Sequence, residues 1–238
     1  MSDLPNLIGA FVADSLAAAS SSFASLGGAA LGSALSAVMK KREDAAREIL
    51  LDEIRHGGAP PTADDVDGSV AILYRYWRAA QEGAGRLNLR LLASVYAGQL
   101  HDRAIVADDF LYYADLLASL RRDEIILLGT FLRHSTNPDG TPRVGDEPMR
   151  MTRDEMVPRI FEVHEDYNAA LGALLRTGLI SADAVGGAIG GGPSMVYRVT
   201  NLLRRLNRLA GIEGVVGRER ADAVAGSESA RGQEGGSA

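Results

Sequence analysis

The chain has 238 residues and a formal net charge of −6 at pH 7, with 46% hydrophobic, 24% charged and only 5% aromatic residues. These values predict an ordinary globular protein of one or two domains. Cysteine is absent, which excludes disulfides, thiol nucleophiles and cysteine-based zinc sites and suits a reducing, cytoplasmic compartment. Arginine outnumbers lysine 23 to 2, which we interpret as the codon usage of a GC-rich bacterial genome.

Residues 1–56 form the first expected region, and within it residues 5–39 are small, apolar and nearly uncharged. Residues 1–4 lack the basic stretch that begins a secretory signal. Asp14 opposes insertion of this segment into a bilayer, because one carboxylate near the centre of a span costs about 3 kcal/mol. We therefore predict water-soluble Ala/Gly/Ser-rich helices that pair with each other or with a second copy of the chain.

A membrane-associated interpretation of residues 5–39 stays open beside this one. Small residues let helices approach closely in lipid. Lys40, Lys41 and Arg42 follow the segment directly, where anionic headgroups would meet them. On this alternative the protein is a helical effector that lies at the periphery of the inner face of a membrane.

One helix is expected from Ala29 to His56, ended by the Gly/Pro-rich residues 57–61. Its predicted apolar seam steps by three and four residues along one face. The seam consists of Leu31, Leu35, Val38, Arg42, Ala45 and Ile49. The opposite, solvated face is expected to carry two i,i+4 pairs, Lys40 with Asp44 and Glu43 with Arg47.

Residues 62–118 are predicted to be entirely helical, without an internal repeat. The first helix carries an apolar stripe that includes Tyr74 and Trp77, and a later one turns Leu91 and Tyr96 inward. Paired glycines separate the two helices.

Residues 119–211 show a different order of elements, in which helices precede two strands. Thr152 to Glu155 match a capping box and predict a helix start at Thr152. A longer helix is expected over 163–177, ended by Gly178. A strand from Leu179, a Gly-rich turn over 186–192 and a second strand over 195–200 follow.

This region resembles the winged-helix superfamily. The resemblance rests on Leu174-Leu175-Arg176-Thr177-Gly178-Leu179-Ile180 and on Tyr197-Arg198-Val199-Thr200, and it covers about residues 119–211. It implies an α+β module with a small β-hairpin wing. Together with the helices expected before residue 119, this predicts a mainly α protein, in which an N-terminal helical hairpin or bundle precedes that module. The helix over 163–177 would then stand at the position of the recognition helix.

The outward positions of that helix favour a protein partner over DNA. Glu162, Glu165, Asp166 and Asn168 would form the binding surface, and three carboxylates repel phosphates. We therefore predict a non-enzymatic adaptor that docks a partner protein or a second copy of itself.

DNA binding by a transcription regulator is the main alternative. The candidate phosphate contacts are Arg150, Arg153, Arg204, Arg205 and Arg208. Against this alternative, the expected wing over 182–193 carries no Arg or Lys, and residues 119–212 have a net charge of only +1. A third possibility is that Arg204, Arg205 and Arg208 of the last expected helix pair with the acidic region 1–118.

No motif predicts catalysis, a cofactor or a metal. His164-Glu165-Asp166 lacks the H-E-x-x-H spacing that places two imidazoles on one helical face. The Gly-rich turn over 186–192 lacks the lysine of a phosphate-binding loop. Residues 212–238 are rich in Gly, Ser, Glu and Arg and are predicted to be a disordered tail.

Overall fold

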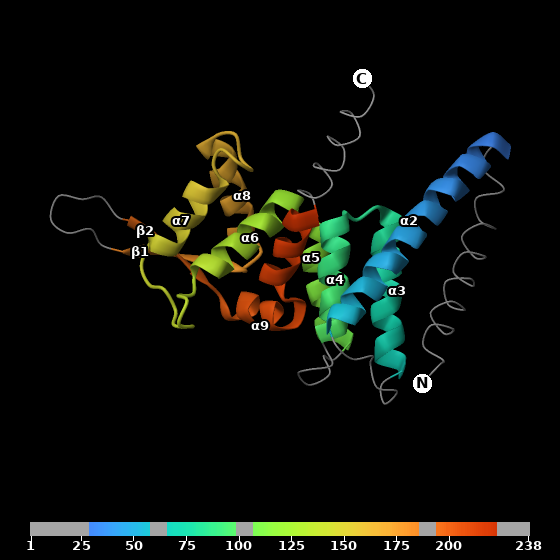
Figure 1. Ribbon diagram of the computed structural model, residues 1–238, viewed down its shortest axis with the longest axis horizontal. Coiled ribbons are helices and arrows are strands. Elements are labelled where there is room, and N and C mark those ends of the chain that lie inside the picture. The colour runs from blue at the N-terminus through green and yellow to red at the C-terminus, as the bar shows by residue number, and fades with distance from the viewer. Residues whose placement is uncertain (1–28, 58–65, 99–106, 186–193, 223–238) are drawn as a thin grey trace, which may run out of the picture. The chain divides into compact units, whose positions relative to one another are not determined.

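The computed structural model describes residues 29–57, 66–98, 107–185 and 194–222 (Figure 1). These parts are mainly helical, with one two-stranded antiparallel sheet, which confirms the expected mainly α class. The chain forms two compact units, residues 1–47 and 48–238. Residues 62–118 and 119–211, which the sequence analysis treated as separate regions, therefore belong to one unit.

Helix α2 (Ala29–Gly57) confirms the expected range, but its buried face differs from the predicted seam. Val38 is 49% exposed, whereas Glu43 is 6% and Leu50 0% exposed. The buried positions, Glu43, Ala46, Leu50 and Glu53, also step by three and four residues. Apolar periodicity therefore identified the helix and missed its buried face, because two of these four side chains are carboxylates.

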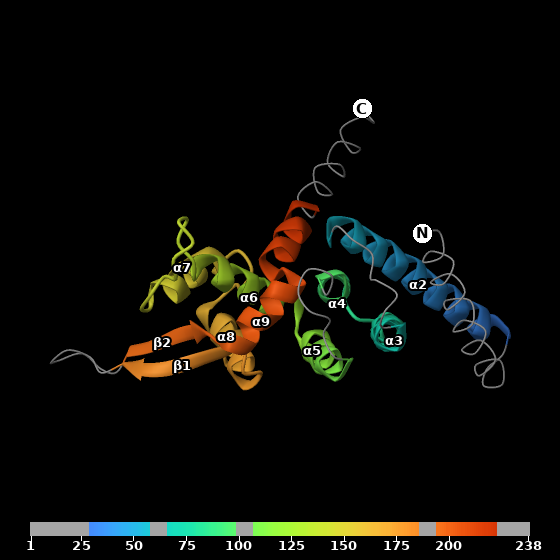
Figure 2. The same ribbon diagram turned by 90° about the horizontal axis from the view of Figure 1, so that it is seen from below.

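Helices α3 (Val66–Glu82), α4 (Arg86–Gly98) and α5 (Ala107–Ser119) follow. Figure 2 shows α4 between α3 and α5 on one side and the helical residues 201–222 on the other. The contacts of α4 with α3, with α5 and with helix α9 (Asn201–Ala210) agree with this view. Every residue over 87–97 is buried. Helix α4 is therefore buried on all sides, whereas the sequence predicted one inward-facing side. On α3 the prediction was wrong for Tyr74, which is 57% exposed, while Tyr76 is buried.

Helices α6 (Arg122–His134), α7 (Glu147–Met156) and α8 (His164–Arg176) come next. The predicted start at Thr152 is wrong. Pro148 stands in the first turn of α7, where its missing N–H is harmless. Thr152 is a buried mid-helix residue whose hydroxyl donates to the Pro148 carbonyl at 2.7 Å.

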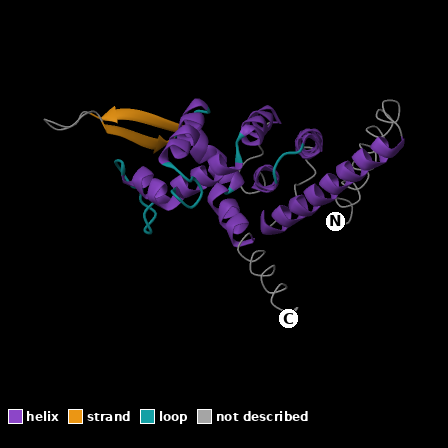
Figure 3. Cartoon of the chain, turned by 90° about the horizontal axis from the view of Figure 1, so that it is seen from above, coloured by secondary structure: helices purple, strands orange, loops and turns teal. Residues whose placement is uncertain are grey.

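Strands β1 (Ile180–Val185) and β2 (Ser194–Val199) pair antiparallel, from Ile180 opposite Val199 to Val185 opposite Ser194 (Figure 3). Helix α9 (Asn201–Ala210) follows at once, because Thr200 caps it by accepting from the Leu203 N–H at 3.2 Å. The predicted helix before the hairpin and the two predicted strands are confirmed to within one or two residues. The Gly-rich turn lies outside the described residues.

Residues 212–222 are helical, so the prediction of a disordered tail from residue 212 is wrong for this stretch. Ile212, Val215 and Val216 are buried. Their spacing of three and four residues gives this helix an apolar face, which the polar composition of residues 212–238 as a whole did not reveal. We call residues 212–222 the C-terminal helix.

The C-terminal helix packs directly on α6. Residues Glu124 to Leu132 of α6 are all buried. A Cβ atom added at Gly129 would lie 2.8 Å from the Val216 Cγ2, which is closer than carbon atoms pack. A glycine at this position therefore allows the two helices to approach.

Two arginines on the C-terminal helix bind carboxylates of other helices. Arg218 pairs with Glu53 of α2, which is 2% exposed and also accepts from the Ser94 hydroxyl at 2.6 Å. Arg220 donates to Glu155 of α7 at 2.8 Å. In the other direction, Arg90 of α4 donates to Asp222 at 2.7 Å.

No helix in the described ranges is both long and apolar enough to cross a bilayer. Most of residues 5–39, on which the membrane alternative rests, lies outside those ranges.

We predict that Gly129→Ala lowers the free energy of unfolding by about 1–3 kcal/mol, because the added methyl group overpacks the contact with Val216. Gly172→Ala is the matched control. A Cβ atom there meets nothing within 4 Å, so helix propensity raises stability by about 0.5–1 kcal/mol. Urea denaturation measures both changes. Equal effects of the two variants would contradict the packing, and adding Val216→Ala to Gly129→Ala is expected to recover part of the loss.

A second prediction concerns Glu155. Burial by itself disfavours its charged form, but hydrogen bonds from Arg133, Arg220 and His134 outweigh burial and lower its pKa from 4.5 to about 2. Because the folded pKa lies below the unfolded one, the carboxylate stabilises the fold above about pH 5, and this contribution is lost as the pH falls.

The stability advantage of the parent over Glu155→Gln is therefore expected to shrink by about 2 kcal/mol between about pH 6 and pH 3. Urea denaturation at each pH measures it. Asp154→Asn is the control, because Asp154 is 59% exposed and pairs only with its neighbour Arg153 in the described structure. A pH-independent difference would contradict the role of the carboxylate.

Candidate functional site

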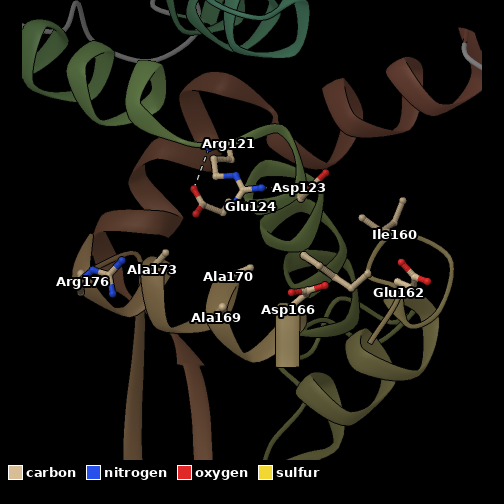
Figure 4. A pocket seen from close by; sticks show the side chains of 11 residues that line it. Arg121, Asp123, Glu124, Ile160, Glu162, Asp166, Ala169, Ala170, Ala173 and Arg176 are labelled. Atoms are coloured by element: carbon tan, nitrogen blue, oxygen red, sulfur yellow. Dashed lines mark hydrogen bonds and ion pairs between the residues drawn. The ribbon is translucent and has the colours of Figure 1, made fainter. Parts of the chain in front are cut away.

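A groove of about 640 Å³ lies where the start of α6 meets α8 (Figure 4). Two chain segments and one helix face line it. The lining residues are Arg121, Asp123, Glu124, Ile160, Phe161, Glu162, Asp166, Ala169, Ala170, Ala173 and Arg176. We call this feature the α6–α8 groove.

One face of helix α8 is buried in the core, and another face forms the floor of the groove. Tyr167, Leu171 and Leu174 are buried and hold the helix in place. Asp166, Ala169, Ala170 and Ala173 therefore turn the other way, since positions three and four apart share a face. The alanine methyl groups protrude little from this face, which leaves room for a partner helix to approach the backbone of α8 closely.

Charge is unevenly distributed along the groove. Asp166 and Arg176 stand ten residues apart on α8, or about 15 Å along its axis. Figure 4 shows Glu162 and Asp166 on one side and Arg176 on the other. One end of the groove is therefore acidic, and the opposite end carries a cation.

Two further carboxylates of the groove are already engaged by its own residues. Glu124 accepts from the Arg121 backbone N–H at 2.8 Å and so caps α6. Asp123 lies 3.9 Å from the Arg121 guanidinium. Glu162 and Asp166 are exposed and form no ion pair with any described residue, which leaves both carboxylates available to a ligand.

The structure divides the four residues that the sequence proposed for partner binding. Glu162 and Asp166 line the groove. Glu165 and Asn168 are also exposed on or beside this helix, but they do not line it. The sequence missed the alanine floor and the contribution of Arg121, because nothing in the sequence pattern pairs α8 with the start of α6.

The arginines proposed for DNA come from two separate helices. Arg150 and Arg153 are exposed on α7, whereas Arg204, Arg205 and Arg208 are exposed on α9. Several already have intramolecular partners: Arg153 pairs with Asp154, and Arg204 donates to the Asn201 side chain at 3.0 Å.

Arg205 lies over the ring of Tyr113 on α5, with its guanidinium carbon 5.8 Å from the ring centroid. A cation–π contact of this kind favours the packing of α9 on α5. Arg205 thus meets the region before residue 119 through an aromatic ring, whereas the predicted partner was a carboxylate. Arg218, which lies outside the predicted cluster, does pair with a carboxylate of this region, that of Glu53.

Among the described residues, no group of three or more His, Asp or Glu side chains is arranged to hold a metal ion. No family model, curated protein or solved structure matches the chain. The groove geometry is therefore the basis for a functional proposal.

Proposed function

We propose that this chain is a non-enzymatic interaction protein, in which residues 119–211 form a winged-helix-like module that docks a protein partner in the α6–α8 groove. Three helices followed by an antiparallel hairpin are the order that the winged-helix resemblance implies. On this interpretation α8 occupies the position of the recognition helix.

The observation that carries the proposal is the pair of unengaged carboxylates, Glu162 and Asp166, beside the alanine floor of α8. A polyanion would be repelled from this end of the groove, because each phosphate there would face a carboxylate. A protein surface with small side chains and a basic group satisfies both features, since shape and charge are matched together.

We predict that a photo-crosslinking amino acid placed at Ala173 of the full chain forms adducts of defined mass in cells. Asp166→Lys is expected to reduce their yield roughly tenfold, which corresponds to the loss of one favourable charge contact. Glu165→Lys is the matched control, because it makes the same change on the neighbouring residue outside the groove. Equal yields from the two variants, or no adduct at Ala173, would rule out the groove as a docking site.

A second candidate function, DNA binding, is favoured by the three exposed arginines of α9. Titration of salt into the purified full chain with a fluorescent random-sequence duplex tests it. If the groove proposal is correct, no salt-sensitive binding occurs. Binding that weakens steeply with salt, with a slope flattened by Arg204→Ala/Arg205→Ala, would instead support DNA binding.

A further inference from the structure

A second exposed surface of this chain has the properties that the groove requires. Over residues 36–42 of α2, each residue is exposed except the half-buried Met39. The stretch contains Lys40 and Lys41, which are the two lysines of the whole chain. Helix α2 thus presents a compact positive charge on an otherwise small-residue surface.

One face of this stretch combines small side chains with a cation. Positions 37, 38 and 41 share a face of the helix, because 37 and 38 lie four and three residues before 41. They are Ala37, Val38 and Lys41, and all three are exposed. Val38 is 49% exposed, so its aliphatic side chain is accessible to a partner. We call residues 37–41 of α2 the basic α2 segment.

The basic α2 segment complements the groove in both shape and charge. Alanine and valine side chains suit a floor made of Ala169, Ala170 and Ala173, since small residues on both helices allow close approach. Lys40 and Lys41 suit the acidic end formed by Glu162 and Asp166, where the Coulomb attraction favours the complex and sets its direction.

We infer that the α6–α8 groove binds the basic α2 segment of a second copy of this chain. The inference rests on the proposed function and names its partner. Both surfaces are exposed in the single chain, as Lys41 on the segment and Asp166 in the groove are.

This arrangement has a consequence for assembly. Each copy offers one segment and one groove, so the contact joins two different surfaces. Such head-to-tail contacts close into a ring when the rotation allows it and otherwise extend into chains. Association is therefore expected to depend on protein concentration and to weaken as salt screens the charges.

Sedimentation velocity of the purified full chain over a range of concentrations tests the inference. The parent is expected to associate. Lys40→Glu/Lys41→Glu alters the segment, and Glu162→Lys/Asp166→Lys alters the groove. Each double variant alone is expected to sediment as a monomer at concentrations where the parent is assembled. Glu165→Lys/Asn168→Lys, on the same helix outside the groove, is expected to assemble like the parent.

Mixing the two double variants gives the decisive measurement. The acidic segment of the first then meets the basic groove of the second, and the basic segment of the second meets the acidic groove of the first. Association is therefore expected to return in the mixture. A monomeric parent, or a mixture that stays monomeric, would overturn the inference. Circular dichroism of each variant separates loss of association from loss of folding.

The crosslink at Ala173 separates failure of this inference from failure of the proposed function. Adducts with the mass of two copies support both. Adducts with another protein, together with a monomeric parent, overturn the second-copy inference and leave the proposed docking function standing. No adduct in cells and a monomeric parent overturn both.

Discussion

The close approach of the C-terminal helix to α6 is the contact on which the larger unit depends. Gly129 leaves room for Val216, so the two helices meet without an intervening side chain. The same helix carries Arg218 toward Glu53 and Arg220 toward Glu155. One short helix therefore connects the end of α2 with α6 and α7. Together with the packing of α4 on α9, it joins the region before residue 119 to the rest of the unit.

The buried charges at this contact determine its geometry more than its stability. Removing two charges from water costs several kcal/mol per ion, which their mutual attraction repays only when the geometry is favourable. Glu53 is 2% exposed, and its Oε1 atom has no hydrogen-bond partner among the described residues, as is also true of the Arg218 Nε atom. An alternative packing would leave such charges buried and unpaired, so these pairs penalise a shift in the register of the C-terminal helix.

The groove is a consequence of this arrangement at the other end of α6. Helix α6 is buried over nearly all its length, which holds its first turn in place beside α8. The Glu124 carboxylate then closes that turn by accepting a hydrogen bond from the Arg121 backbone N–H. The alanine floor of α8 faces outward because Tyr167 and Leu174 are fixed in the core. The groove is thus placed by core packing, to which its own Phe161 contributes through an edge-to-face contact with Tyr167.

Local signals in the sequence determined most of the elements. Gly178 and Thr200 bound α8 and α9 because glycine tolerates a positive φ angle and a threonine hydroxyl caps a helix. Tertiary structure decided which faces are buried. The mid-helix charges Glu43 and Arg90 are buried, although sequence rules place charges in solvent. It also decided that residues 212–222 fold, and that Glu162 and Asp166, but not Glu165, line the groove. Helix signals act over three or four residues, whereas these outcomes depend on partners as much as 165 residues away, as for Glu53 and Arg218.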